Sequence, residues 1–465
     1  MNSSCSSRWW PVLCILAPWG LACDDGATPA ADADVSTETE AGADADADAG
    51  ADGDDESGAD ADADADAGPI PPDPSRDIRH TALAVDLATR EATASIALAP
   101  AASTSASFEV GALEIREVRG ADGPLPYAVE GARLDVLLGD TVDLVVSYSF
   151  PERPGTFDGW MRSGSTLVWP YWCGNLFPCH SDPSDGLTFD LAVADPGDGL
   201  VAVHPDAIPT DAPSYQLAWA VGDYGYTSLG TTSAGTELGM WTLPGGEAAA
   251  AAGTEGLVDA FEWYERTLGP YAFGDRAGPV AVDWPPGAIG GMEHHPFWHV
   301  DVLAMSLPLV HVHEAAHGWF GDAVRLACWE DLVLSEGTAT YLAARASGQA
   351  IGSEAEAAAW AEYDRRLDAV FRSGDRVVLP AGCGEVDVLD DGLFSDAVYV
   401  KGAFFFRAVA DAIGADELDR ALRVFFSGHV GEAARMDDLL DAILAETGFD
   451  PGPLADAWLR NVGRP

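Results

Sequence analysis

The hydrophobic period of this 465-residue chain changes near Gly245-Gly246. Before that point apolar and polar residues alternate, as strands require; the clearest runs are 80–87, 94–98, 112–118 and 134–148. After it, one short strand is expected over 280–284 and helical spacing dominates; the helical runs are 247–252, 257–268, 310–319, 332–346, 354–372, 397–413, 415–426 and 436–446. The two periods predict an α+β chain, with an antiparallel β domain over 76–245 and a mostly helical domain over 246–465.

The first 23 residues have the pattern of an export signal. Arg8 precedes an apolar run over 9–21 that is too short to cross a bilayer but suits the core of a signal peptide. The run leads into Gly20-Leu21-Ala22-Cys23, which resembles a bacterial lipobox with Cys23 as the lipidated residue. We expect export and lipid anchoring at the bacterial cell envelope, with ordinary cleavage and secretion as the alternative.

Residues 24–75 form a low-complexity acidic segment. They alternate Ala and Asp and contain 18 acidic residues with no Lys or Arg. Such a segment cannot bury a core and its like charges repel, so it predicts a disordered tether. The whole chain has a formal charge of −52, which argues against partners such as nucleic acid or an anionic membrane surface. Membrane contact is therefore expected through the lipid alone.

The seven cysteines fit this organisation. Two lie in the signal and Cys23 is assigned to the lipid, which leaves four, an even number in an exported protein. Cys173 and Cys179 are close enough in sequence for a local disulfide, and Cys328 with Cys383 is then the second pair by elimination. Because none has CxxC spacing, a cysteine-based zinc site is not expected.

A candidate metal centre lies in the helical half. His313-Glu314-Ala315-Ala316-His317 places two imidazoles four residues apart on one side of a helix, with Glu314 beside them to activate water. Glu336 follows His317 after eighteen residues, on a second amphipathic helix, and can supply a third ligand. Two His and one Glu leave the fourth position of a Zn²⁺ ion open, as hydrolysis requires.

Several segments resemble the gluzincin zinc aminopeptidases of the aminopeptidase N and leukotriene-hydrolase type. Residues 313–322 are similar to that family's HELAHQWFGN motif, and residues 329–341 to WWNDLWLNEGFATY. Gly290-Gly291-Met292-Glu293 is similar to GAMEN, and Tyr399-Val400-Lys401-Gly402 to the YxKG segment. The resemblance covers roughly residues 76–465 and implies a thermolysin-like catalytic domain after the β domain.

The resemblance also implies roles at the metal. His313, His317 and Glu336 correspond to the ligands of one Zn²⁺ per chain. Glu314 corresponds to the general base that activates water and passes a proton to the leaving amine. Tyr399 corresponds to the residue that hydrogen-bonds the oxyanion of the tetrahedral intermediate.

Further matches concern the substrate and the surroundings. Glu293, with Gly290-Gly291-Met292 before it, corresponds to the group that binds the substrate's free α-amino group. Asp331 corresponds to a residue that orients a zinc-binding histidine. Two positions depart from the motifs: His294 stands in place of Asn, and Gly318 in place of Gln. The chain also stops soon after what resembles the end of the catalytic domain, so we expect the family's helical C-terminal domain to be absent and the site to be open.

We therefore expect a zinc-dependent aminopeptidase that acts on peptides with a free N-terminus. A zinc endopeptidase is the alternative if Glu293 lies away from the metal, and a non-catalytic surface-binding lipoprotein is the alternative from another class. Four more histidines are expected to be polar lining or surface, with a second metal site as the alternative; they are His294, His295, His299 and His311. The preferred N-terminal residue and the oligomeric state do not follow from the sequence.

Overall fold

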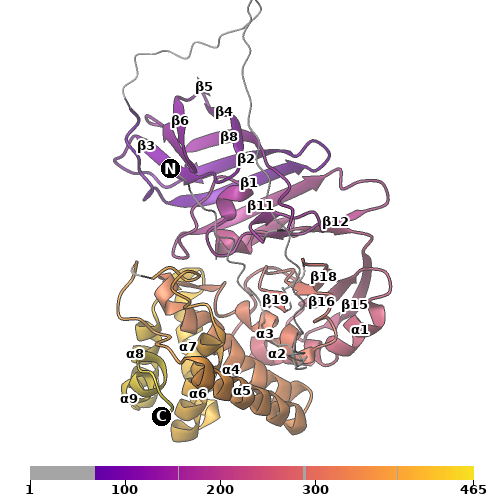
Figure 1. The fold of residues 1–465 in the computed structure, drawn as a ribbon, viewed down its shortest axis with the longest axis vertical. Coiled ribbons are helices and arrows are strands. Elements are labelled where there is room, and N and C mark those ends of the chain that lie inside the picture. Colours follow the sequence, from indigo (N-terminus) through magenta and orange to yellow (C-terminus); the bar gives the residue numbers. More distant parts are fainter. Residues whose placement is uncertain (1–68, 156, 286–289, 385) are drawn as a thin grey trace, which may run out of the picture. The chain divides into compact units, whose positions relative to one another are not determined.

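The computed structural model describes residues 69–465 except 156, 286–289 and 385 (Figure 1). The predicted signal peptide, Cys23 and most of the predicted tether lie outside these residues. Ile70–Pro465 belong to one compact unit. Within the described part of the chain, no helix is both long and apolar enough to cross a membrane.

A seven-stranded sheet organises the N-terminal part, in the order β13-β11-β1-β2-β8-β4-β5. The β1–β11 pair is parallel, whereas the other pairs of this sheet are antiparallel. The parallel pair differs from the predicted antiparallel pattern. β11 lies far from β1 in the sequence, and the local alternation of apolar and polar residues does not indicate which distant strand a strand pairs with. The strands are β1 (Ile78–Asp86), β2 (Glu91–Leu98), β4 (Glu114–Gly120), β5 (Gly123–Pro124), β8 (Asp143–Ser149), β11 (Gly186–Ala194) and β13 (Ala207–Pro213).

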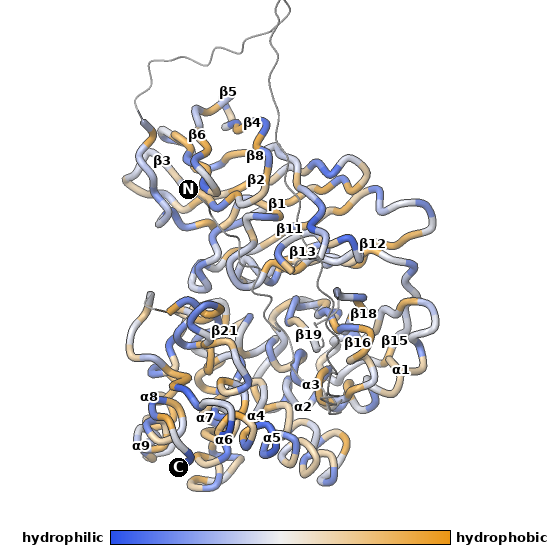
Figure 2. The backbone as a smooth tube through the Cα atoms, in the orientation of Figure 1, coloured by the Kyte–Doolittle hydropathy of each residue, from blue (hydrophilic) through white to orange (hydrophobic). Residues whose placement is uncertain are grey.

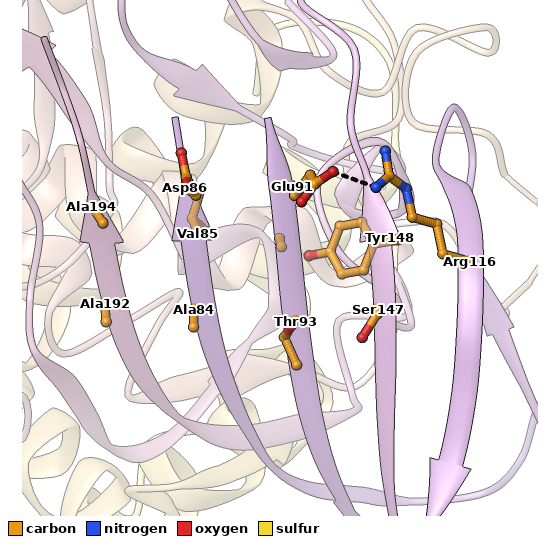
Figure 3. A pocket seen from close by; sticks show the side chains of 11 residues that line it. Ala84, Val85, Asp86, Glu91, Thr93, Arg116, Ser147, Tyr148, Ala192 and Ala194 are labelled. Atoms are coloured by element: carbon orange, nitrogen blue, oxygen red, sulfur yellow. Dashed lines mark hydrogen bonds and ion pairs between the residues drawn. The ribbon is translucent and has the colours of Figure 1, made fainter. Parts of the chain in front are cut away.

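The two faces of this sheet differ in character. In β2 every second residue is buried, so one face forms core, with Leu83 and Ile96 buried in it. Figure 3 shows a pocket on the other face of the sheet. It is lined largely by small or polar side chains, and Ala84 and Ala192 are exposed there. There Arg116 on β4 pairs with Glu91 on β2. The alternation seen in the sequence therefore corresponds to one packed face and one solvated face.

Smaller sheets complete this part. The run 134–148 is divided between two strands, β7 and β8, because Gly139 takes a positive φ of 60° in the turn between them. A three-stranded sheet has the order β3-β7-β6, and two further pairs are β9–β10 and β12–β14. Their bounds are β3 (Ser105–Glu109), β6 (Tyr127–Glu130), β7 (Arg133–Leu137), β9 (Gly159–Trp160), β10 (Thr166–Leu167), β12 (Val201–Val203) and β14 (Ala220–Gly222).

A second large sheet leads into the helical part. Its order is β15-β16-β18-β20-β19, with β17 also paired to β16. The first two strands precede residue 245, and β16 pairs with β17 and β18, which follow it, so the sheet crosses the predicted domain boundary. The strands are β15 (Gly225–Thr231), β16 (Glu237–Thr242), β17 (Arg276–Ala277), β18 (Val280–Val282), β19 (Gly291–Met292) and β20 (His299–Asp301).

The helices follow the periodicity of the sequence closely. Of the 19 residues of α4, 15 are buried, as expected of a central helix. Helices α3, α5 and α6 pack against it (Figure 1). Figure 2 shows the hydropathy of each residue along these helices. The helices are α1 (Glu247–Gly253), α2 (Leu257–Thr267), α3 (Pro308–His317), α4 (Leu332–Ala350), α5 (Ser353–Ser373), α6 (Asp396–Ile413), α7 (Ala415–His429), α8 (Met436–Thr447) and α9 (Gly452–Ala455).

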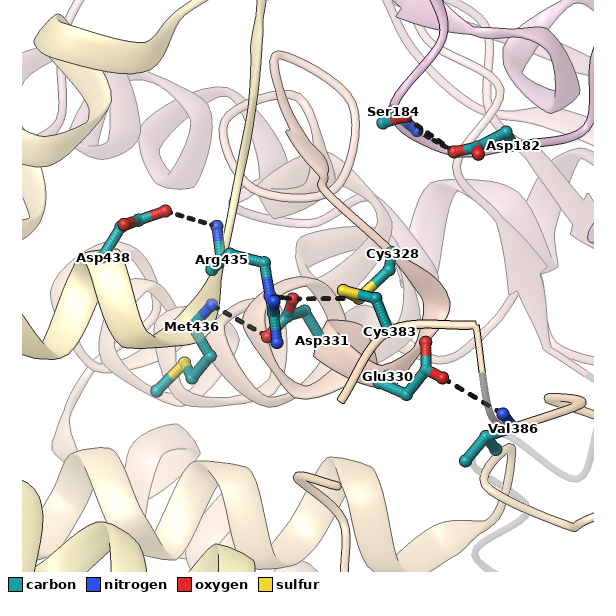
Figure 4. The surroundings of a disulfide bond; sticks show 10 residues. All are labelled: Asp182, Ser184, Cys328, Glu330, Asp331, Cys383, Val386, Arg435, Met436 and Asp438. Carbon is teal, nitrogen blue, oxygen red and sulfur yellow. Dashed lines mark hydrogen bonds and ion pairs between the residues drawn. A yellow bond between two sulfur atoms is a disulfide. The ribbon is translucent and has the colours of Figure 1, made fainter. Parts of the chain in front are cut away.

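Short connections tie the helical part together. Strands β21 (Val324–Leu326) and β22 (Glu432–Ala434) form a parallel pair. Both predicted disulfides are confirmed, because Cys173 is bonded to Cys179, and Cys328 is bonded to Cys383, as Figure 4 shows. The second disulfide holds the loop before α6 to the start of α4.

Candidate active site

The three predicted ligand atoms meet between α3 and α4. His313 Nε2 and His317 Nε2 lie 3.1 Å apart. Glu336 Oε2 lies 3.3 Å from the first and 3.4 Å from the second. Ligands held at about 2.0–2.1 Å from a tetrahedral zinc ion are about 3.3 Å from one another, so these atoms fit one face of such a site.

The two oxygens of Glu336 have different surroundings. Oε1 accepts a hydrogen bond of 2.9 Å from the hydroxyl of Tyr399, whereas Oε2 is buried and accepts none from the described residues. Burial raises the pKa of Glu336, but His317 and His313 outweigh it and lower the pKa to about 2. An ionised oxygen without a donor is costly to bury, and a metal ion between the histidines would satisfy it.

A hydrogen bond fixes the ring of His317. Its Nδ1 lies 3.1 Å from the carbonyl oxygen of Phe320 and 3.2 Å from Ser335 Oγ. Because a carbonyl accepts only, Nδ1 carries a hydrogen and Nε2 faces the other ligands. Nε2 is therefore the nitrogen of His317 that can bind a metal ion.

The charge of the site favours a cation. Burial lowers the pKa of His313 to about 4, so its ring is neutral at neutral pH. Burial also lowers the pKa of His317, but the carboxylates of Glu293 and Glu336 outweigh it and raise the pKa to about 10. The same carboxylates attract a divalent ion, so the donor set and the charge both fit zinc.

Tyr399 reaches the ligands because α4 and α6 cross at two glycines. A Cβ on Gly337 would lie 2.8 Å from the Cα of Gly402, and a Cβ on Gly402 would lie 2.5 Å from the Cα of Gly337. The helix axes can approach this closely only where both side chains are absent. Glu336 is next to one glycine and Tyr399 is one turn before the other, so the crossing sets their 2.9 Å hydrogen bond.

Two more carboxylates face the same pocket. Glu314 lies against β19, because a Cβ on Gly291 would be 2.5 Å from its carboxyl carbon. Ligand atoms of Glu293, Glu314 and His317 all lie within 4.8 Å of one another. Burial raises the pKa of Glu314 well above its usual range, and raises that of Glu293 to about 7. Met292 lines the pocket beside them, and Gly290 accepts a hydrogen bond from Asp301 that joins β19 to β20.

The structure corrects the prediction for Asp331. Its Oδ1 accepts a hydrogen bond of 3.0 Å from the amide of Met436, and its Oδ2 pairs with Arg435 (Figure 4). Its carboxylate therefore anchors the start of α8 and does not contact a zinc-binding histidine. Ser335 and the Phe320 carbonyl hold His317 instead, and the position of Ser335 next to Glu336 is the signal that would have found it.

Two aromatic residues of the pocket were not predicted. Trp169 follows β10 in the N-terminal part, and Phe394 precedes α6; their ring centroids are 4.5 Å apart. Both line the same pocket as Glu293, Glu314 and Glu336. No motif marks Trp169, because its place in the pocket depends on how the β-rich part meets the helices.

The four extra histidines are buried. The rings of His294 and His299 are 4.8 Å apart, but none of the four joins a group of three potential ligands among the described residues. Burial lowers the pKa of each, to about 3 for His295 and His299 and to about 4 for His311. They are neutral interior side chains: none lies at the surface, and none lines the pocket of Glu293, Glu314 and Glu336, so the prediction of polar lining or surface is corrected.

Residues 304–458 match the model of the peptidase family M1 domain, and they include the three ligands, Glu314 and Tyr399. This matched segment, about a third of the chain, is similar to an M1 peptidase domain. Aminopeptidase N of Streptomyces lividans is 30% identical over 155 residues, which are 33% of this chain and 18% of that protein. Aminopeptidase B of Mus musculus is 27% identical over 380 residues, 70% of this chain and 55% of that protein. The chain thus spans about half or less of the length of these relatives.

The fold agrees with M1 structures. The M1 zinc metallopeptidase from Deinococcus radiodurans superimposes with a TM-score of 0.70 at 17% identity, over 84% of this chain and 95% of that one. The predicted order of a β-rich part followed by a mostly helical part is therefore confirmed.

Proposed function

We propose that this chain is a zinc aminopeptidase that removes N-terminal residues from peptides. The observation that carries the proposal is the position of Glu293, whose carboxylate shares one pocket with the three ligands and Glu314. A carboxylate at this place can bind the substrate's α-ammonium group and hold the first peptide bond at the catalytic groups. The aminopeptidase relatives support the same activity.

The residues divide the chemistry among themselves. His313, His317 and Glu336 would hold one zinc ion per chain, and that ion would supply a more acidic water and a polarised scissile carbonyl. Glu314 takes a proton from the attacking water and gives it to the leaving amine. Tyr399 would turn its hydroxyl hydrogen, which Glu336 Oε1 accepts in the structure, to the carbonyl oxygen as negative charge develops there.

A panel of free and N-acetylated peptides, with and without a chelator, tests the proposal. We expect free peptides to lose their first residue, acetylated peptides to stay intact, and the chelator to abolish activity until zinc is restored. Cleavage of both peptide forms would instead indicate an endopeptidase. A purified chain without stoichiometric zinc and inert on the whole panel would indicate a non-catalytic binding protein.

We also propose that the protein is exported and anchored by a lipid on Cys23. The support is the short apolar run and the lipobox-like sequence before this cysteine. A Cys23→Ser variant should move from the membrane fraction to the soluble fraction. Unchanged membrane association of Cys23→Ser would contradict the lipid anchor.

A further inference from the structure

His295 links the loop that carries Glu293 to the helix that carries Glu314. Its ring is fully buried, and both ring nitrogens have partners: Nδ1 is 2.7 Å from the hydroxyl of Tyr271, and Nε2 is 2.8 Å from the carbonyl oxygen of Glu314. Its own carbonyl accepts a hydrogen bond of 2.8 Å from Gln216. The ring is therefore held from both sides.

These partners fix the tautomer of the ring. A carbonyl can only accept, so Nε2 of His295 carries the hydrogen and donates it to Glu314. Nδ1 then accepts the hydrogen of the Tyr271 hydroxyl. Burial lowers the pKa of His295 to about 3, which agrees with a neutral ring.

The bonded carbonyl lies in the last turn of α3, where helix carbonyls lack helical partners. The amide of Gly318, which ends the helix, bonds to the carbonyl of Ala315 at 3.3 Å, and His295 serves the carbonyl of Glu314. This turn carries His317 as well. A side chain from the Glu293 loop thus stabilises the turn that holds a ligand and the base.

Gly318 leaves the space that the ring of His295 occupies. Its φ of −57° and ψ of −11° are open to any L-residue. Yet a Cβ there would lie 2.9 Å from Cε1 of His295 and 2.9 Å from Cε2 of Tyr271. The glycine is therefore required by these two rings and not by the backbone.

We propose that His295 is a positioning residue that clamps the Glu293 loop to the last turn of α3. Tyr271 orients its ring, and the missing side chain at Gly318 makes room for it. The clamp fixes the distance between Glu293, which binds the substrate's amine, and Glu314, the general base. The inference rests on the proposed function in assigning those roles to Glu293 and Glu314.

Substitutions of His295 test the clamp. His295→Ala should lower kcat on a free peptide about tenfold or more, because small displacements of catalytic groups are costly. It should also weaken zinc binding about tenfold in chelator competition, because the turn of His317 loosens. His295→Gln, whose amide can donate to Glu314 and accept from Tyr271, should keep both values within about threefold of wild type.

A double-mutant cycle tests the match with Gly318. Gly318→Ala should displace the ring and lower kcat as His295→Ala does. Because both changes remove the same contact, the double variant should be little worse than either one. Losses that multiply in the double variant would overturn the proposed match.

A buried histidine elsewhere separates positioning from general stability. His180 bonds the carbonyl of Ser107 at 2.8 Å and pairs with Asp185 in the β-rich part. His180→Ala should lower Tm but leave kcat and zinc affinity of the folded protein unchanged. Wild-type values of both kcat and zinc affinity in His295→Ala would overturn the clamp. A wild-type chain inert on peptides, with zinc affinity still reduced in His295→Ala, would refute the proposed function and support the clamp.

Discussion

At the scale of single residues, Glu314 combines burial with a position against a glycine. Its exposed fraction is 2%, and the absence of a side chain at Gly291 lets its carboxylate lie at the floor of the pocket. A buried carboxylate without a cation nearby holds its proton, and a carboxylate beside zinc can release it.

Glu314→Gln should lower kcat by about a thousandfold or more while leaving zinc content unchanged. The amide keeps the shape of the side chain but cannot accept the proton of water. Steady-state kinetics and zinc analysis of the purified variant measure both quantities. Glu265→Gln is the matched control, because Glu265 is buried and bonded to Thr236 at 2.6 Å outside the pocket. Full turnover by Glu314→Gln would contradict the mechanism.

Activity on free peptides should fall as the pH is lowered through about 7. Burial, assisted by the charge of Glu336, raises the pKa of Glu293 to about 7. Below that pH the carboxyl is protonated and no longer attracts the α-ammonium group; above it the charge is present. The measurement is kcat/KM against pH for wild type and Glu293→Gln. A wild-type profile that is flat from pH 8 to 5 would refute this role.

At the scale of elements, the sequence predicted the helices well and the strand partners poorly. The spacing of apolar residues predicts α3, α4 and α6, and the motif with its eighteen-residue spacing to Glu336 predicts that His313, His317 and Glu336 meet. It could not give the parallel pairing of β1 with β11, because that depends on residues far apart in the chain. Nor could it give the partners of Asp331, since a motif marks a position and not the direction of a side chain.

The crossing of α4 and α6 gives a prediction at this scale. Gly337→Ala should separate the helices, destabilise the protein by about 1–3 kcal/mol through overpacking, and lower kcat about tenfold as Tyr399 moves away from Glu336. Urea unfolding and steady-state kinetics measure these effects. Gly428→Ala on α7 is the control, because a Cβ there meets nothing within 4 Å and should stabilise the helix slightly.

At the scale of the whole molecule, the β-rich part completes the pocket that the helices begin. Trp169 packs against Phe394 and, at 5.7 Å between ring centroids, against Trp329. The hydroxyl of Tyr171 accepts a hydrogen bond of 2.8 Å from the amide of Val388. The site therefore depends on the join between the two parts, which no single segment of the sequence encodes.

Arg325 on β21 is the polar centre of that join. Its exposed fraction is 6%, and its guanidinium donates to the carbonyls of Asp211 at 2.9 Å, Gly431 at 2.8 Å and Ser184 at 3.4 Å. A Cβ on Gly186 would lie 1.9 Å from its Cζ, so the β-rich part is shaped around this side chain. The planar guanidinium of Arg325 thus fixes the position of the β-rich part relative to the helical part.

Arg325→Leu should lower the free energy of unfolding by about 2–4 kcal/mol, because it leaves buried carbonyls without donors. It should also lower activity, because the join positions Trp169 at the pocket. Urea unfolding followed by tryptophan fluorescence measures the first effect, and kcat/KM the second. Arg79→Leu is the control: its side chain is 63% exposed beside Asp77, and surface pairs contribute little. Equal stability and activity of Arg325→Leu and Arg79→Leu would show that the join does not depend on the guanidinium.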